Sequence, residues 1–276
     1  SRNYRRVTID KKDGGSRTLL VPCSLLKGVQ RNILHHVLDE RPVSPCAQAY
    51  RKGTDIRGNA SCHLGKKLDI SHFFDSILFP RVYGAAFPET LFPPAAAMLL
   101  TSLCCCNERL PQGSPASPAI SNLVMRPFDI YMDGWCRERG IAYTRYCDDM
   151  TFSGDFDAAA LCSKVRSYLE AMGFTLNEKK TKLLTGDVRQ SVTGIVVNDK
   201  LQVSREYRKK LRQEVYYCKK YGIDAHLERV EADTGIRWEK ERYICSVQGR
   251  LRFVLQVNPQ DDEFAGYCRE WKELFM

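Results

Sequence analysis

The sequence has no apolar run long enough to span a membrane and no segment typical of a secretory leader. It also has no internal repeat and no low-complexity tract. These absences argue against membrane-spanning and repeat architectures, and they favour a folded protein of the reduced cytoplasm with no membrane partner. The chain begins at Ser1 rather than methionine, which fits either trimming or a short natural start.

Paired cysteine motifs are missing as well, although the chain contains 12 cysteines. No Cys-x-x-Cys spacing occurs, so the usual pattern of a zinc site is absent. Cys104, Cys105 and Cys106 are contiguous, a spacing that is wrong for zinc and too short for mutual disulfide bonds. They follow the apolar run Ala95–Leu103, and we predict that they are small core residues.

Positive charge is in excess, because 42 lysines and arginines oppose 33 aspartates and glutamates, giving a net charge of +9. Such an excess suits a polyanionic partner, since neutralising phosphates releases counterions, although it would also serve solubility alone. The length of 276 residues and the hydrophobic fraction of 43% suffice for a buried core in one elaborate domain or in two.

Two adjacent carboxylates, Asp148 and Asp149, lie between two runs of strand-forming residues. The flanks Ile141–Tyr146 and Met150–Phe152 predict a β-hairpin with both acids at its tip. Adjacent carboxylates repel each other, so burying this turn is costly unless a cation neutralises it. Taken alone, the pair is better explained as a solvated turn, but a second acidic motif reverses that preference.

The second motif is the segment Leu68–Phe74, which predicts a short strand ending in Asp69 and then a turn into a helix. One carboxylate at a strand end plus two on a hairpin is the arrangement of a two-metal site, where oxygen ligands hold two Mg²⁺ ions about 3.5–4 Å apart. Mg²⁺ keeps few protein ligands and completes its octahedron with water and substrate phosphates, so three aspartates suffice.

A third motif, Leu110–Pro118, reads Leu-Pro-Gln-Gly-Ser-Pro-Ala-Ser-Pro. Its prolines predict a rigid loop that leads into a helix starting near Ala119. Gln112 is followed by a glycine that permits close approach, so this glutamine is a candidate for contact with a nucleotide.

Together and in this order, the three motifs resemble those of the reverse transcriptase family. That family has an aspartate followed five residues on by an aromatic residue, then Leu-Pro-Gln-Gly-x-x-x-Ser-Pro, then Tyr-x-Asp-Asp. The resemblance covers nearly the whole chain. Lys12–Arg17 resembles the fingers hairpin that grips the incoming triphosphate, and Gly173–Asn177 with Lys180 resembles the palm segment whose lysine approaches the leaving pyrophosphate.

Two further matches indicate the retron branch of the family. Asn59 to His63 fits the Asn-Ala-x-x-His signature of retron reverse transcriptases, and Val192 to Gly194 fits their Val-Thr-Gly signature. Enzymes of diversity-generating retroelements usually end the Gln-Gly motif in Ser-Gln, whereas this chain has Ser117-Pro118.

The resemblance implies a role for each motif residue. The catalytic and metal-binding residues are Asp69, Asp148 and Asp149, with the backbone carbonyl of Ile70 as a further ligand. The metals are two Mg²⁺ ions, for which Mn²⁺ can substitute. The incoming deoxynucleoside triphosphate (dNTP) is bound by Lys12, Arg17, Phe74, Gln112 and Lys180, with Lys11 as a competitor for the role of Lys12. The RNA is held by Asn59, His63, Val192, Thr193 and Gly194.

Phe74 stands where the family places an aromatic gate, which excludes a ribose 2′-hydroxyl and admits a deoxyribose. Phe73 is expected to be its core-facing neighbour, and a shift of one residue would exchange the two.

The stretch after Arg205 predicts a helix with one apolar stripe, and lysines and arginines occupy the other faces of this helix. This helix lies where the family has its thumb, and we expect it to track a nucleic-acid duplex.

The implied fold is α+β, a right hand of fingers, palm and helical thumb, with an antiparallel palm sheet. The expected domains are fingers 1–66, palm 67–190 with a helical insertion at about 81–106, a primer-grip-like hairpin 191–203 and a thumb 204–276. Local patterns predict a hairpin from Val7–Asp10 and Arg17–Val21, a helix capped by Ser24, and a hairpin from Val192–Val197 and Leu201–Val203.

The implied activity is DNA synthesis on RNA from dNTPs. A structured non-coding RNA would be both template and primer, priming would start from a guanosine 2′-hydroxyl, and the products would be an RNA–DNA hybrid and a branched molecule. The resemblance also implies anti-phage defence, often beside an effector protein. The alternatives are a group II intron-type enzyme, another phage-defence reverse transcriptase, and a non-catalytic RNA-binding scaffold.

Overall fold

The computed structural model describes residues 3–10, 15–51, 53–61, 65–178, 181, 191–192, 194–197 and 200–275, without the side chains of residues 61, 65–67 and 69. The chain divides into two compact units. The first comprises Ser1–Asp55 and Cys62–Thr185, and the second comprises Ile56–Ser61 and Gly186–Met276. The expected domain ranges remain predictions, but the short segment 56–61, inside the expected fingers, belongs to the second unit.

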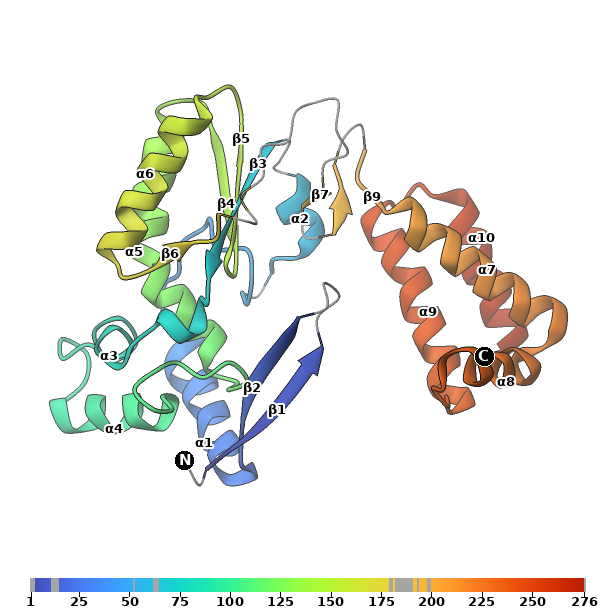
Figure 1. The fold of residues 1–276 in the computed structure, drawn as a ribbon, viewed down its shortest axis with the longest axis horizontal. Coiled ribbons are helices and arrows are strands. Elements are labelled where there is room, and N and C mark those ends of the chain that lie inside the picture. The colour runs from blue at the N-terminus through green and yellow to red at the C-terminus, as the bar shows by residue number, and fades with distance from the viewer. Residues whose placement is uncertain are drawn as a thin grey trace. The chain divides into compact units, whose positions relative to one another are not determined.

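A long hairpin opens the first unit and lies beside its first helix (Figure 1). Strand β1 (Tyr4–Asp10) pairs antiparallel with β2 (Ser16–Pro22), which is longer at both ends than the pattern of alternation predicts. Helix α1 (Ser24–Ile33) continues into a π-helical turn, Leu34–Leu38. The prediction of Ser24 as the cap is wrong by one residue, because Cys23 is the N-cap and its side chain accepts no capping hydrogen bond.

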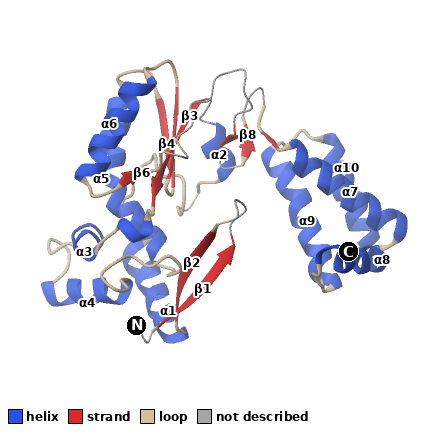
Figure 2. Ribbon diagram, viewed as in Figure 1, coloured by secondary structure: helices blue, strands red, loops and turns tan. Residues whose placement is uncertain are grey.

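An antiparallel sheet forms the centre of this unit, with strand order β4-β5-β3-β6. The strands are β3 (Gly65–Ser71), β4 (Ala142–Tyr146), β5 (Asp149–Ser153) and β6 (Thr175–Leu176). Helices α5 (Ser117–Arg137) and α6 (Ala158–Ala171) pack against one side of the sheet (Figure 2). The expected mixed α+β class with an antiparallel sheet is confirmed.

Between the motifs Leu68–Phe74 and Leu110–Pro118, the chain forms two helices, α3 (Phe79–Ala86) and α4 (Pro94–Cys104). A 3₁₀ turn, Phe74–Ser76, precedes them. The three contiguous cysteines are buried, as predicted. Burial raises the pKa of Cys104 and of Cys105 to about 12, so both thiols are neutral packing groups.

The second unit has its own core, in which a small sheet and a short helix meet four longer helices. The short elements are α2 (Ile56–Ser61), β7 (Ser191–Val192), β8 (Ile195–Val196) and β9 (Gln202–Val203). The long helices are α7 (Arg205–Tyr221), α8 (Ile223–Thr234), α9 (Lys240–Val257) and α10 (Asp262–Phe275). The predicted hairpin between Val192–Val197 and Leu201–Val203 is confirmed in part, because β8 pairs antiparallel with β9. Its first arm is divided, however, since Val192 belongs to a separate strand, β7, that pairs with β8.

None of the helices in the described part of the chain has the length and apolarity that crossing a membrane requires.

Candidate active site

The acidic hairpin forms as predicted, but its tip is shifted. Tyr146 of β4 pairs with Asp149 of β5, so the loop consists of Cys147 and Asp148, and Asp149 is the first residue of a strand rather than part of the tip. Cys147 has a positive φ of 61°. Two-residue hairpin loops need such a conformation because it matches the twist of the flanking strands. Both aspartates are partly exposed, so they remain accessible to a ligand.

The register of the sheet brings the second acidic motif to the same place. Residue 69 of β3 lies directly opposite Asp149 of β5, and the next residue, Ile70, donates its backbone N–H to the carbonyl of Asp148 at 3.1 Å. Opposed Cα atoms in an antiparallel pair are about 4.5–5.5 Å apart. The backbone therefore places the three predicted catalytic positions together, although the side chain of Asp69 lies outside the described residues.

A cavity of about 600 Å³ opens in front of these residues. Its lining includes six of the predicted site residues: Arg17, Ile70, Phe74, Gln112, Asp148 and Asp149. Tyr50 and Asn177, which the sequence analysis did not assign to the site, also line it. Six segments from different parts of the first unit thus meet at one cavity, as a site that binds a nucleotide against two carboxylates requires.

The carboxylates fit a hard divalent cation. Mg²⁺ and Mn²⁺ prefer oxygen ligands, and Asp148 and Asp149 present carboxylates at the wall of a polar cavity large enough for phosphate and water. Among the described side chains no three histidine, cysteine, aspartate or glutamate residues cluster as a metal site, and the third predicted ligand, Asp69, is not among those side chains. The ligand set of three aspartates therefore remains a prediction.

Cys147 is neither a nucleophile nor a thiolate ligand. It is buried, and burial raises the pKa of its thiol to about 12, so the thiol stays protonated at neutral pH. Its sulfur accepts a hydrogen bond from the hydroxyl of Tyr50 at 3.4 Å. Its place between Tyr146 and Asp148 is therefore a matter of conformation and packing.

The two phenylalanines after β3 differ in environment. Phe73 is 4% exposed and its ring stacks on Phe174 with centroids 5.8 Å apart, which makes it a core residue. Phe74 is half-buried and touches Phe73 edge-on at 5.3 Å. Both residues border the cavity, and Phe74 is the more exposed of the two.

The Gln112 loop is tied to the opening hairpin. The backbone carbonyl of Gln112 accepts the N–H of Leu20 at 2.8 Å, and a Cβ at Gly113 would lie 2.7 Å from the carbonyl oxygen of Leu20. The sequence suggested that this glycine permits close approach to a nucleotide. The approach that the structure describes is to the backbone of β2, which holds Gln112 and Arg17 at the same cavity.

We expect Gly113→Ala to destabilise the protein more than Gly140→Ala. Both glycines have a positive φ, 126° and 66°, so each change adds a backbone strain of about 1–2 kcal/mol. Only Gly113 also meets backbone atoms, which adds about 1–3 kcal/mol of overpacking, whereas nothing lies within 4 Å of a Cβ at Gly140. Denaturant unfolding of the two variants measures the difference, and equal losses would show that the Leu20 contact is not tight.

Behind the acidic turn lies a buried ion pair that the sequence patterns did not predict. Arg145 and Asp129 are both 0% exposed, and Nη2 of Arg145 lies 2.7 Å from Oδ2 of Asp129. Burial lowers the pKa of Arg145, but the charge and hydrogen bonds of Asp129 outweigh it and hold this pKa above its ordinary value. A charged residue inside the strand Ala142–Tyr146 was the available signal, and its partner on α5 was not predictable from local pattern.

The predicted RNA-binding residues fall in the second unit or outside the description. Asn59 is 1% exposed and Val192 is 3% exposed, so their side chains pack in the core and do not present a surface to RNA. Gly194 is exposed, with φ of 86°, in the turn between β7 and β8. Helix α2, which carries Asn59 and Ala60, packs against β7 and β8, so the two retron signatures form one structural element.

Four further predicted site residues lie outside the described residues: Lys12, His63, Lys180 and Thr193.

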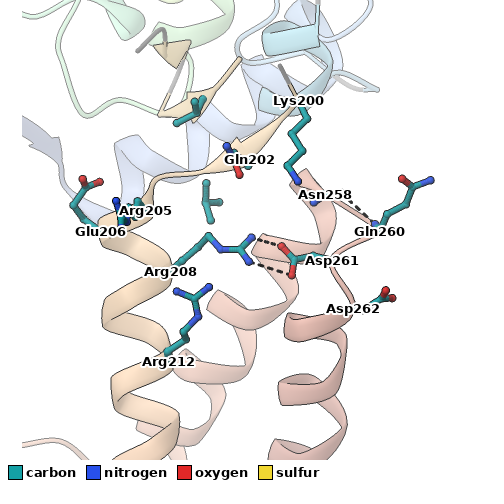
Figure 3. Close-up of a pocket in the computed structure, with 12 residues that line it drawn as sticks. Lys200, Gln202, Arg205, Glu206, Arg208, Arg212, Asn258, Gln260, Asp261 and Asp262 are labelled. Carbon is teal, nitrogen blue, oxygen red and sulfur yellow. Dashed lines mark hydrogen bonds and ion pairs between the residues drawn. The ribbon is translucent and has the colours of Figure 1, made fainter. Parts of the chain in front are cut away.

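Helix α7 carries many lysines and arginines, and some of them form ion pairs with acidic side chains of the same unit. Arg208 pairs with Asp261, just before α10, in a groove of about 740 Å³ (Figure 3). Arg212 pairs with Glu263, and Lys219 pairs with Glu270 at 2.9 Å. Arg205 also lines the groove and is exposed. Lys209 and Lys210 are exposed as well and take no part in these pairs.

Sequence comparison matches most of the chain to one known family. The family described as Reverse transcriptase (RNA-dependent DNA polymerase) matches residues 9–221. The retron Mx65 reverse transcriptase of Myxococcus xanthus is 34% identical over 95% of this chain and 63% of its own length. The retron Ec86 reverse transcriptase of Escherichia coli is 32% identical over 92% of this chain and 77% of its own length. The chain thus spans slightly less than two thirds of the first relative.

Solved structures share the fold at low identity. A Candida albicans telomerase in complex with a TWJ fragment of telomeric RNA aligns with a TM-score of 0.55 at 10% identity, over 97% of this chain and 63% of that chain. An apo telomerase from Candida tropicalis aligns with a TM-score of 0.50 at 12% identity, over 73% of this chain and 55% of that chain. The right-hand polymerase fold, the acidic motifs at one cavity and the extent of the family match lead to one conclusion: this chain belongs to the reverse transcriptase family, in its retron branch.

Proposed function

We propose that this chain is the RNA-directed DNA polymerase of a retron, which copies a structured non-coding RNA into branched single-stranded DNA by two-metal nucleotidyl transfer. The observation that carries the proposal is the meeting of residue 69, Asp148 and Asp149 at a cavity lined by Arg17, Phe74 and Gln112. A role in anti-phage defence, with an effector protein as a partner, belongs to the same proposal by resemblance to retron enzymes.

In this proposal the three aspartates share one task, which is to bind the metal ions. Asp69, Asp148 and Asp149 hold two divalent cations, Mg²⁺ or Mn²⁺, with the backbone carbonyl of Ile70 as a further ligand. The bound cations supply positive charge that stabilises the reacting phosphate and the leaving pyrophosphate. No protein nucleophile is required, because the primer hydroxyl attacks, and this agrees with the neutral, buried thiol of Cys147.

The remaining cavity residues bind and orient the dNTP. Arg17 presents a planar guanidinium that matches phosphate oxygens, and Gln112 lies where a nucleotide would pass over its loop. Phe74 closes the side of the cavity next to the sugar, and a flat ring there excludes a 2′-hydroxyl. Lys12 and Lys180 complete the set as further phosphate contacts.

The second unit provides RNA recognition in this proposal. The buried packing of α2 against β7 and β8 supports one rigid element, whose exposed feature is the turn at Gly194. Asn59 and Val192 act through that packing rather than by contact, and His63 and Thr193 are candidates for direct contact. Exposed cations of α7, including Arg205, Lys209 and Lys210, contact the RNA or RNA–DNA backbone, since helical RNA is read mainly by shape and phosphates.

Primer extension on two templates tests this function. The wild-type protein is expected to extend an annealed DNA primer on a generic RNA, and to start DNA synthesis unaided on the RNA that co-purifies with it. We expect Gly194→Val to reduce self-primed synthesis at least about tenfold, the effect of losing roughly one recognition contact, and to retain extension of the annealed primer.

Gly235→Val is the matched control. Gly235 also has a positive φ and open space around a Cβ, but it caps α8 far along the chain from the signatures. It is expected to retain both activities. Loss of both activities in the Gly194 variant alone would assign the turn to the general handling of primers, and absence of any dNTP-dependent extension by the wild type would refute the proposed function.

A further inference from the structure

The strongest unexplained feature of the first unit is the buried ion pair between Arg145 and Asp129. Nε of Arg145 donates to Oδ1 of Asp129 at 2.8 Å, and Nη2 donates to Oδ2 at 2.7 Å, which is a bidentate geometry. The hydroxyl of Tyr143 donates to the same carboxylate at 2.9 Å. Asp129 is therefore fully engaged, and it fixes the guanidinium in one orientation.

The guanidinium uses its other donors on the loop that carries Asp148. Nη1 of Arg145 donates to the backbone carbonyl of Cys147 at 2.9 Å, and Nη2 also donates to Oδ1 of Asn122 at 3.2 Å. The amide of Asn122 in turn donates to the carbonyl of Ala49 at 2.9 Å. One buried arginine thus connects α5 to the turn that carries Asp148. The 44–49 segment is bonded to the side chain of Asn122 and, through backbone hydrogen bonds, to Arg145 itself.

The turn that Arg145 holds is strained. Cys147 has φ of 61°, whereas Asp148 is not in the positive region, and glycine is the usual residue at this first position of a two-residue loop. A side chain in this conformation costs about 1–2 kcal/mol. The surroundings must therefore determine the conformation, and the carbonyl of Cys147 is the group whose direction changes if the turn relaxes.

Stability alone does not explain a charged pair in this place. Replacing a buried ion pair by apolar residues of similar volume is often neutral or stabilising, because desolvation offsets the attraction between the charges. An apolar side chain could fill the same space beneath the sheet, but it could not donate to the Cys147 carbonyl. Arginine adds donors with fixed directions, and one of them holds the backbone carbonyl of the residue before Asp148.

We propose that Arg145, oriented by Asp129, is a positioning residue that fixes the Cys147–Asp148 turn and so holds the Asp148 carboxylate in the orientation that binds the catalytic cation. The inference rests on the proposed function for its catalytic consequence. Its direct consequence is a property of the protein without substrate, namely its affinity for a divalent cation.

Arg145→Lys tests the proposal. Lysine keeps the positive charge beside Asp129, but its single ammonium cannot serve both carboxylate oxygens and the Cys147 carbonyl in the fixed directions of a guanidinium. We expect Mn²⁺ affinity, measured by electron paramagnetic resonance on the free protein, to fall about 10–100-fold, the usual effect of removing a partner that orients a metal ligand. The kcat of primer extension is expected to fall by a similar factor, with the KM for dNTP within about twofold.

Arg137→Lys is the matched control, because Arg137 forms an exposed ion pair with Asp133 on the same helix as Asp129. It is expected to bind Mn²⁺ and extend primers like the wild type. If the wild type and this control bind Mn²⁺ but extend nothing, the proposed function fails, and the positioning inference is still decided by the Mn²⁺ affinity of Arg145→Lys. Wild-type affinity in folded Arg145→Lys would overturn the inference.

A rescue separates positioning from general packing. Adding Cys147→Gly to Arg145→Lys is expected to restore Mn²⁺ affinity in part, because glycine adopts a positive φ without cost. Adding Cys147→Ala removes the same sulfur but keeps the Cβ, and is expected to restore nothing. Equal rescue by alanine would overturn the inference.

If Arg145→Lys does not fold, the charge-balanced double variant Asp129→Asn with Arg145→Gln takes its place. Replacing both partners avoids an uncompensated buried charge. It is expected to show the same loss of Mn²⁺ affinity, and wild-type affinity in this variant would equally overturn the inference.

Discussion

Asp148→Asn is expected to reduce primer extension about 10³-fold while leaving RNA binding unchanged. The change keeps the size and shape of the side chain but removes the negative charge that holds a cation at the cavity wall. Losing several kcal/mol of charge stabilisation at the reacting phosphate corresponds to three or more factors of ten in rate. The basic surface of the second unit, where we propose RNA binding, is untouched.

Single-turnover extension with Mg²⁺ measures the first effect and a gel shift with RNA measures the second. Asp155→Asn is a suitable control, because Asp155 is an exposed carboxylate just after the end of β5 and does not line the cavity. Extension by Asp148→Asn near the wild-type rate would remove Asp148 from the set of metal ligands.

The second large effect is expected at Phe74, where valine should admit ribonucleotides. The half-buried ring lines the cavity, and removing it opens the space that a 2′-hydroxyl would occupy. Steric discrimination by a single side chain is worth about 1–3 kcal/mol, so the preference for deoxyribonucleotides should fall about 10–200-fold. Matched dNTP and ribonucleotide incorporation, each as kcat/KM, gives this ratio directly.

Phe73→Val separates gate from core. Phe73 is buried against Phe174, so its truncation should lower the free energy of unfolding and leave the sugar preference as it is. A change of preference in the Phe73 variant, with none in the Phe74 variant, would exchange the two assignments.

Local pattern was sufficient for the elements that carry the motifs. Alternation and turn chemistry predicted the hairpin around Asp148, because each strand is short and bounded by residues that favour turns. The prolines of the Leu110–Pro118 motif likewise predicted a helix starting near Ala119, and α5 begins two residues earlier, at Ser117. Errors at this level were small shifts, such as Cys23 for Ser24 as the cap and Asp149 in a strand rather than at the tip.

Long-range pairing was beyond local pattern. Nothing near Arg145 in sequence indicates that Asp129 lies across from it, since the two are on a strand and a helix joined by a turn. The membership of 56–61 in the second unit was equally invisible, because six residues between loops carry too weak a periodicity. In both cases the partner is defined by tertiary packing, which overrides what the segment would do alone.

The second unit is built from two separate segments of the chain, and this has a consequence for folding during synthesis on the ribosome. Residues 56–61 leave the ribosome early, but the strands they pack against, β7 and β8, come only after the whole of 62–185 has been made. The nascent chain must hold α2 without its partners while the first unit folds, since domains generally fold as they emerge. A version of the chain that ends before residue 186 would keep α2 but never supply its partners, and Ala60, now buried among them, would stay exposed to solvent.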